Sequence, residues 1–295
     1  MCGIVGLFLK KDELRPRLGD MLTDMLITMT DRGPDSAGIA IYGDDAAGLK
    51  ITVQSDDPAG AFDGLAEVLG AELGQPVAIK LADTHAVLTV PEGAERAASA
   101  FLDARGLRIM GVGKSMEIYK EVGLPKDVAA RFGIRAMGGS HGIGHTRMAT
   151  ESAVTTLGAH PFSTAEDQCL VHNGSLSNHN DMRRRLARKG FVPKTENDTE
   201  VAACYISSRI AAGDNLGQAL EGTLKDLDGF FTFVTGTHNG FGVVRDPIAC
   251  KPAVMAETDD YVAFASEYRA LVDLPGIENA RVWEPEPATV YFWER

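Results

Sequence analysis

The second residue of the chain is a cysteine, and the sequence opens Met1-Cys2-Gly3-Ile4-Val5-Gly6. An initiator methionine is usually removed when a small residue follows it, which would leave Cys2 with a thiol and a free α-amine. The amine titrates at about 7.7–8.0 and a thiol at about 8.5, so the amine can accept the thiol proton near neutral pH. Such a residue is a nucleophile that carries its own base. The alternative is that a cysteine follows Met1 by chance, and the rest of the chain decides between the two.

The charge and hydropathy of the chain exclude several classes of partner. A net charge of −12 argues against nucleic acid and against an anionic membrane, because both require a basic surface. No apolar run approaches the ~20 residues that span a bilayer. The first nine residues lack the charged start and long apolar core of a signal peptide, so we expect a cytoplasmic protein.

Metal binding is not expected either. The four cysteines are Cys2, Cys169, Cys204 and Cys250, and their wide spacing contains no zinc pattern. His141 and His145 are four residues apart, but the glycines around them argue against a metal-binding helix face.

The hydrophobic pattern predicts helices between blocks of strands, which indicates stacked layers of helix and antiparallel sheet. An apolar stripe predicts a helix over 18–30, between strands at 2–9 and 37–42. Residues 50–113 form a unit of their own, in which strands and helices follow the order βαββαβ of ferredoxin-like modules. The competing interpretation of this unit is an irregular extension of the main sheet.

Six short blocks after Cys2 carry most of the residues suited to chemistry. They are 31–38, 144–150, 159–162, 171–178, 197–200, and 245–247 together with 265–267. Each is weak alone: Asn173-Gly174 is typical of a tight turn, and 197–200 of a helix N-cap. Together, in this order, they resemble the class II glutamine amidotransferases, the glutaminases with an N-terminal nucleophile. The resemblance covers 2–42 and about 138–270.

Within that family the chain is most similar to a stand-alone glutaminase-type subunit of a split glutamate-synthase-like complex. The phrases at 145–152, 172–180 and 248–252 are similar to the small subunit of N-methylglutamate synthase.

The resemblance implies an α+β fold, the four-layer αββα sandwich of the N-terminal nucleophile hydrolases. Residues 2–43 and 138–295 would form the glutamine amidotransferase domain. Residues 44–137 would form an inserted α+β module of the βαββαβ type, projecting from one edge. This insert would be a docking surface or a lid, and its acidic composition favours contact with protein.

The resemblance also implies roles for single residues. Cys2 would attack the side-chain amide of glutamine, with its α-amine as the base. Asn173 and the Gly174 amide would hold the oxyanion, and glycine allows the backbone N–H to face the site.

Other residues would bind the two charged ends of glutamine. Arg147 would bind the α-carboxylate, for which a planar guanidinium is suited, and Thr150 would assist it. Asp198 would pair with the α-ammonium. Arg32 and Gly33 would support the nucleophile. We expect structural roles for His145, His160, His172, Asp246 and Glu267, while Glu151 departs from the histidine of relatives.

The function implied is hydrolysis of L-glutamine to L-glutamate and ammonia through a Cys2 thioester. The chain shows no dinucleotide fingerprint and no P-loop, so a synthase subunit would accept the ammonia. By resemblance that partner would carry FMN and an iron–sulfur cluster, and this chain itself would need no cofactor. The alternatives are an N-terminal nucleophile amidohydrolase acting on another amide, and a catalytically silent scaffold subunit.

Overall fold

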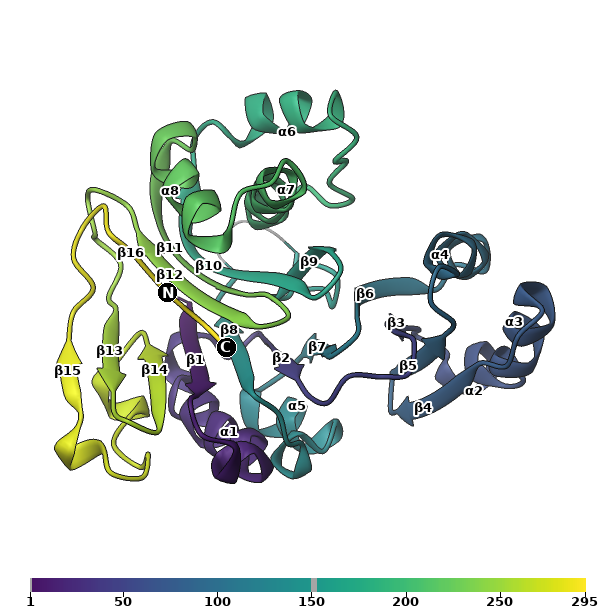
Figure 1. The fold of residues 1–295 in the computed structure, drawn as a ribbon, viewed down its shortest axis with the longest axis horizontal. Helices are drawn as coiled ribbons and strands as arrows, with labels where there is room; N and C mark the ends of the chain where they lie inside the picture. Colours follow the sequence, from purple (N-terminus) through teal and green to yellow (C-terminus); the bar gives the residue numbers. More distant parts are fainter. Residues whose placement is uncertain (1, 150–152) are drawn as a thin grey trace.

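Two antiparallel sheets form the centre of the molecule, which is a computed structural model that describes residues 2–149 and 153–295 (Figure 1). The larger sheet has seven strands, and β1 and β8 lie at its centre. In spatial order its strands are β15 (Arg281–Trp283), β13 (Val254–Glu257), β14 (Tyr261–Ala265), β1 (Gly3–Leu9), β8 (His141–Arg147), β2 (Ser36–Tyr42) and β7 (Met116–Val122). The smaller sheet contains β16 (Val290–Glu294), β12 (Gly240–Arg245), β11 (Gly229–Gly236), β10 (Gln168–Leu176) and β9 (Phe162–Ala165).

Strand β1 explains why the two sheets stack. Every residue of this strand is buried. Ile4 and Phe8 belong to the core between the two sheets, whereas Val5, Leu7 and Leu9 face the core on the other side of the seven-stranded sheet. Because alternate side chains of a strand point to opposite faces, a strand that is apolar on both faces needs a layer on each side.

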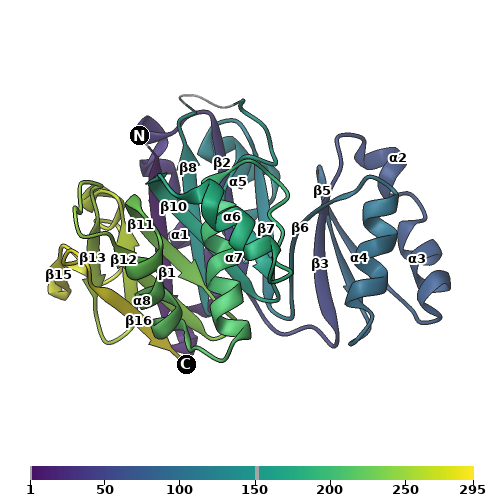
Figure 2. The ribbon, with the colours of Figure 1, turned by 90° about the horizontal axis from the view of Figure 1, so that it is seen from above.

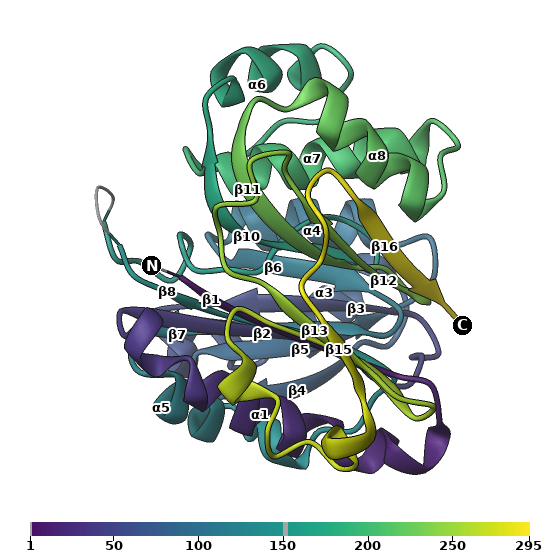
Figure 3. The same ribbon diagram turned by 90° about the vertical axis from the view of Figure 1, so that its left-hand side faces the viewer.

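Helices supply those outer layers. On the seven-stranded sheet lie α1 (Leu18–Thr28) and α5 (Pro125–Arg131), and on the five-stranded sheet α6 (His179–Ala187), α7 (Asp198–Ala211) and α8 (Leu216–Asp226). Short 3₁₀ turns lie at Asp12–Arg17, Thr30–Arg32, Ile134–Ala136, Tyr268–Ala270 and Ile277–Asn279. Figure 3 shows the four layers in the order helix, sheet, sheet, helix. The predicted αββα sandwich is therefore confirmed.

A third sheet lies to one side of the sandwich (Figure 2). Its elements are β3 (Leu49–Gln54), α2 (Pro58–Phe62), α3 (Leu65–Leu73), β4 (Ala78–Ala82), β5 (His85–Val90), α4 (Glu95–Ala104) and β6 (Arg108–Gly113). The antiparallel strand order β4-β5-β3-β6 has the ferredoxin-like arrangement expected from the βαββαβ pattern. Its apolar core is separate from those of the sandwich. We call residues 49–113 the module.

The expected insert, 44–137, contains more than this module. Strand β7 pairs with β2 along its whole length, and α5 contacts α1. Met116 and Ile118 lie in the core between the two sheets of the sandwich. These two elements therefore pack as parts of the sandwich. Within 2–149 and 153–295, no helix is both long enough and apolar enough to cross a membrane.

Candidate functional site

Cys2 immediately precedes β1, so the central strand of the larger sheet places the start of the chain. In the antiparallel pair β1–β8, Gly3 lies opposite Thr146, and Arg147 is the next residue of β8. Arg147 also lies opposite Ser36 of β2. The sheet register thus brings Cys2 and Arg147 to the same edge of the sandwich. Met1 lies outside the described residues.

Asn173 and Gly174 reach the same edge from the other sheet. They lie on β10, and the side-chain Nδ2 of Asn173 donates to the Cys2 carbonyl oxygen at 3.2 Å. Gly174 has a φ of +153°, and a Cβ there would lie 1.9 Å from the carbonyl oxygen of Phe230. Only glycine fits this position, because any side chain would collide with the neighbouring strand.

Asp198 is the first residue of α7, and the side chain of Asn197 caps the helix by accepting from the Thr199 amide. The Asp198 carboxylate accepts from the Leu176 amide at 2.9 Å and lies 3.6 Å from Nδ1 of His172. Burial acts to raise the pKa of Asp198. The hydrogen bonds and the charge interaction with His172 outweigh it, and the pKa is lowered below its ordinary value. Asp198 is therefore an anion held in place.

These residues line one cavity of about 290 Å³. Its walls are formed by Cys2, Arg147, Met148, Ala149, His160, His172, Asn173, Gly174, Asn197, Asp198, Thr199 and Lys251. The cavity thus brings together chemical groups from four parts of the fold. They are the thiol of Cys2 at the chain start, the guanidinium of Arg147 at the end of β8, the amide groups of Asn173 and Gly174 on β10, and the carboxylate of Asp198 on α7. The cations Arg147 and Lys251 and the anion Asp198 in one small cavity suit a ligand that carries charges of both signs.

Arg32 and Gly33 lie behind the nucleophile, outside this lining. The Arg32 Nε donates to the Cys2 carbonyl oxygen at 3.0 Å, and its Nη1 lies 2.7 Å from Glu267. The hydrogen bond from Arg32 lowers the pKa of Glu267. A Cβ on Gly33 would lie 2.5 Å from the amide nitrogen of Arg147. Arg32 therefore holds the backbone of Cys2, and Gly33 allows the close approach of the backbone at Arg147.

Three buried histidines stand next to the cavity. Nε2 of His145 lies 3.1 Å from the His172 carbonyl oxygen, and burial lowers the pKa of His145 to about 3. The ring of His160 stacks on that of His145, with 4.0 Å between centroids, and burial lowers its pKa as well. The Thr199 hydroxyl lies within hydrogen-bond distance of both His160 and His172. His145 is fully enclosed, whereas the other two form part of the cavity wall.

The sequence reasoning missed Lys251, Met148 and Thr199 as cavity residues. The Lys251 ammonium lies 4.9 Å from the ring centroid of Phe230. Lys251 falls in the 248–252 phrase used for the family resemblance, which was the available signal. Thr150, together with Glu151, lies outside the described residues.

Among residues 2–149 and 153–295, no group of three His, Cys, Asp or Glu side chains is arranged to hold a metal ion. The groups that are present suit nucleophilic attack on a carbonyl: a thiol, amide donors for an oxyanion, and charged anchors for the rest of the substrate.

The sequence of the chain is similar to those of known proteins. A model described as a glutamine amidotransferase domain matches residues 145–273. The Rhizobium meliloti glutamine amidotransferase-like protein GlxB is 67% identical over 303 residues, covering 100% of this chain and 98% of that protein. The amidophosphoribosyltransferase of Methanocaldococcus jannaschii is 30% identical over 165 residues, 55% of this chain and 35% of that protein.

A solved structure shares the fold. The glutamine phosphoribosylpyrophosphate amidotransferase from B. subtilis, complexed with ADP and GMP, has a TM-score of 0.63 at 19% identity. The match covers 99% of this chain and 47% of that one, so the chain spans about half its length.

Proposed function

The chain belongs to the class II glutamine amidotransferases, and we propose that it hydrolyses L-glutamine to L-glutamate and ammonia with Cys2 as the nucleophile. One observation carries this proposal: Cys2, Arg147, Asn173, Gly174 and Asp198 line a single cavity. These five residues come from distant parts of the sequence.

Cys2 would act after removal of Met1. The freed α-amine would take the thiol proton, and the thiolate would attack the amide carbon of glutamine. The protonated amine would then return its proton to the departing nitrogen, which leaves as ammonia. A water molecule would hydrolyse the resulting thioester by the same route in reverse, regenerating the thiol and releasing glutamate.

The oxyanion formed in both steps needs donors at the place where charge develops. The Asn173 amide lies beside Cys2 and would supply one of them. The Gly174 backbone N–H would supply the other. Both donors belong to the part of β10 that pairs with β11, so they are held before the substrate arrives.

Arg147 and Asp198 would hold the two ends of the substrate. The guanidinium would pair with the α-carboxylate and the Asp198 carboxylate with the α-ammonium. Because Asp198 is ionised and fixed by its backbone contact, it favours a free amino acid over an acylated one.

Ammonia released here requires an acceptor. We propose a synthase subunit of the glutamate-synthase or N-methylglutamate-synthase type, which would carry FMN and an iron–sulfur cluster of its own. The reactive thiol favours a reducing compartment, the cytoplasm.

Intact-mass analysis after treatment with a diazoketone analogue of glutamine tests the nucleophile. We expect loss of Met1 and one adduct, and no adduct on a Cys2→Ala variant. Glutaminase activity from a chain that keeps Met1 unmodified would refute the mechanism.

Equal turnover of glutamine and Nα-acylglutamine would favour an amidohydrolase of other specificity. Full support of the complex by Cys2→Ala, with glutamine as the nitrogen donor, would favour a silent scaffold.

A further inference from the structure

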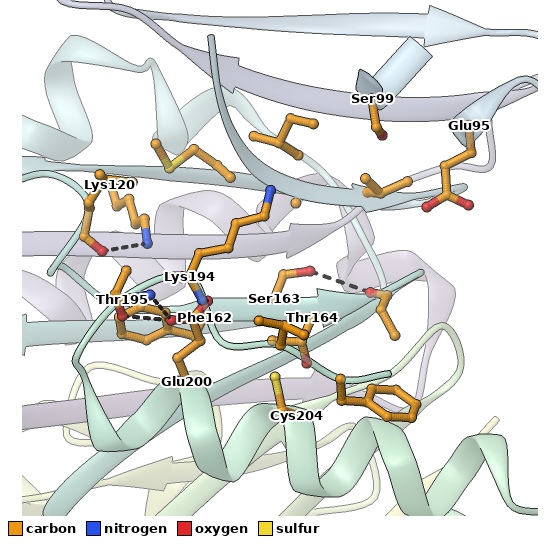
Figure 4. Close-up of a pocket in the computed structure, with 18 of the residues that line it drawn as sticks. Glu95, Ser99, Lys120, Phe162, Ser163, Thr164, Lys194, Thr195, Glu200 and Cys204 are labelled. Atoms are coloured by element: carbon orange, nitrogen blue, oxygen red, sulfur yellow. Dashed lines mark hydrogen bonds between the residues drawn. The ribbon is translucent and has the colours of Figure 1, made fainter. Parts of the chain in front are cut away.

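A second and larger cavity, of about 460 Å³, lies where β6 and α4 of the module meet β9 and α7 of the sandwich (Figure 4). Three of its charged side chains have partners within the protein. The buried Lys120 ammonium donates to two backbone carbonyl oxygens, at 2.8 and 3.1 Å. The Glu200 carboxylate accepts from two backbone amides of the loop before α7, and the Lys194 ammonium lies 3.6 Å from Asp103. These charges hold the walls of the cavity together.

Lys251, in the 290 Å³ cavity of the candidate site, is a cation of a different kind. Its Nζ lies 4.9 Å from the ring centroid of Phe230, and no carboxylate in the described part of the chain forms an ion pair with it. An aromatic face attracts an ammonium group but leaves hydrogen-bond donors of that group unused. The Lys251 ammonium therefore keeps donors for a ligand in the cavity.

Hydrogen bonds fix the loop that carries Lys251. Nη2 of Arg245, the last residue of β12, donates to the carbonyl oxygens of Ala249 and Lys251, at 2.7 Å each. The Asp246 carboxylate accepts from the Phe231 amide at 2.9 Å, which ties the start of the loop to β11. The backbone at Lys251 is therefore held in place.

The position of Phe230 places the Lys251 ammonium at the nucleophile end of the cavity. Phe230 lies opposite Ser175 in the pair β10–β11, and Asn173 is two residues from Ser175 on β10. Residues two apart on a strand share a face of the sheet with their cross-strand partners, so Phe230 and Asn173 lie on the same face. Nδ2 of Asn173 donates to the Cys2 carbonyl oxygen at 3.2 Å. Lys251, which covers Phe230, is therefore placed toward Cys2.

The charged side chains of the cavity match L-glutamate better than L-glutamine. Arg147 and Lys251 are cations and Asp198 is an anion. Glutamine carries one charge of each sign, whereas glutamate has a second carboxylate on its side chain. If Cys2 attacks the side-chain amide, as the proposed function requires, this second carboxylate forms at the Cys2 end of the cavity.

We propose that Lys251 binds the side-chain carboxylate of L-glutamate, while Arg147 and Asp198 keep the α-carboxylate and the α-ammonium. The product then competes with glutamine for the site, and Lys251 sets the strength of this inhibition. The inference rests on the proposed function.

Calorimetric titration with the two amino acids tests the inference. Both are titrated into the full-length Cys2→Ala protein, in which glutamine should not be turned over, with and without Lys251→Met. The second substitution should weaken glutamate binding about tenfold and glutamine binding less than about twofold, because only glutamate has a charge that meets the ammonium. Lys251→Arg keeps the charge and should retain the affinity for glutamate. Lys225→Met, at an exposed lysine of α8, is the matched control.

Kinetics of the protein with Cys2 intact provide a second measurement, in which Lys251→Met should raise the inhibition constant of glutamate by a similar factor. Equal weakening of both ligands would give Lys251 a packing role alone and would overturn the inference, as would an unchanged affinity for glutamate. Binding of neither ligand would contradict the proposed function together with the inference. Glutamate binding that depends on Lys251, in a chain that lacks Met1 and does not hydrolyse glutamine, would contradict only the proposed function.

Discussion

The sandwich and the module bury their polar groups differently. Around the candidate site, hydrogen bonds join residues far apart in sequence. Arg32 and Asn173 both donate to the Cys2 carbonyl oxygen, Arg32 also donates to Glu267, and Asp198 accepts from the Leu176 amide. The core of the module is built from apolar side chains of its own helices and strands. No residue of 49–113 lines the 290 Å³ cavity, whereas both units line the 460 Å³ cavity. The candidate site therefore lies within the sandwich, and the larger cavity lies at the junction of the two units.

The largest expected effect tests whether chemistry is confined to the sandwich. Asn173→Ala removes a side-chain donor beside Cys2, and kcat for glutamine should fall on the order of 10²–10³-fold with KM little changed. Ser99→Trp in the module should leave kcat within about twofold. Steady-state glutaminase assays of both variants provide the comparison. A comparable loss of kcat in Ser99→Trp would mean that the module contributes to the chemical step.

The Asp198 and Asp167 carboxylates have different expected roles, one in substrate binding and the other in attachment of the module. Asp198→Asn should raise KM for glutamine by about 10–100-fold, because a charge-assisted contact contributes about 1.5–3 kcal/mol. Asp167 instead accepts from the backbone amides of Lys114, Ser115 and Met116, where the chain returns from the module. Asp167→Asn should lower the free energy of unfolding by about 1.5–3 kcal/mol and leave KM unchanged. Urea unfolding and steady-state kinetics of both variants measure the two quantities. A raised KM in Asp167→Asn, or a change confined to stability in Asp198→Asn, would contradict these roles.

The sequence indicated the layers of the sandwich and the order of elements in the module, because both depend on local periodicity. It did not indicate β7, whose sequence Met-Glu-Ile-Tyr-Lys-Glu-Val carries three charges. Lys120 is buried there only because carbonyl groups of residues 159 and 161 meet it, which no local pattern records. The motif blocks identified the candidate site residues. Lys251 and Thr199 fall within these motifs but were given no role, because packing between distant segments decides which side chains reach the cavity.

Lys120 gives the junction a distinctive pH dependence. Burial lowers the pKa of Lys120 from 10.5 to about 7. Between these values the unfolded chain binds a proton that the folded chain does not, so stability rises with pH. We therefore compare the free energy of unfolding of the wild type with that of Lys120→Met. The difference, wild type minus variant, should increase from pH 7 to pH 10 by up to about 1.4 kcal/mol per pH unit. Urea titrations across this range measure the difference, and a constant difference would show that the ammonium stays charged when folded.

The smallest effect is expected on the surface of the module, at the Arg108–Asp56 pair. The guanidinium donates to both carboxylate oxygens, at 2.9 and 2.5 Å. Hydrogen bonding by Arg108 is the main cause that lowers the pKa of Asp56 from 3.8 to about 2. A depressed pKa of an acid stabilises the folded chain above pH 3.8, and this contribution is lost as the pH falls toward 2.

Solvent screening limits what this pair contributes. The Arg108 and Asp56 side chains are 36% and 70% exposed, so the coupling should be below about 1 kcal/mol despite the two-bond geometry. A double-mutant cycle with Arg108→Gln and Asp56→Asn, in low salt and in 0.5 M NaCl (roughly a 4 Å screening length), measures it. The coupling should shrink in salt and be lost as the pH falls through about 2. A coupling of several kcal/mol that is insensitive to salt would mean that the surface of the module is organised like the buried polar network of the sandwich.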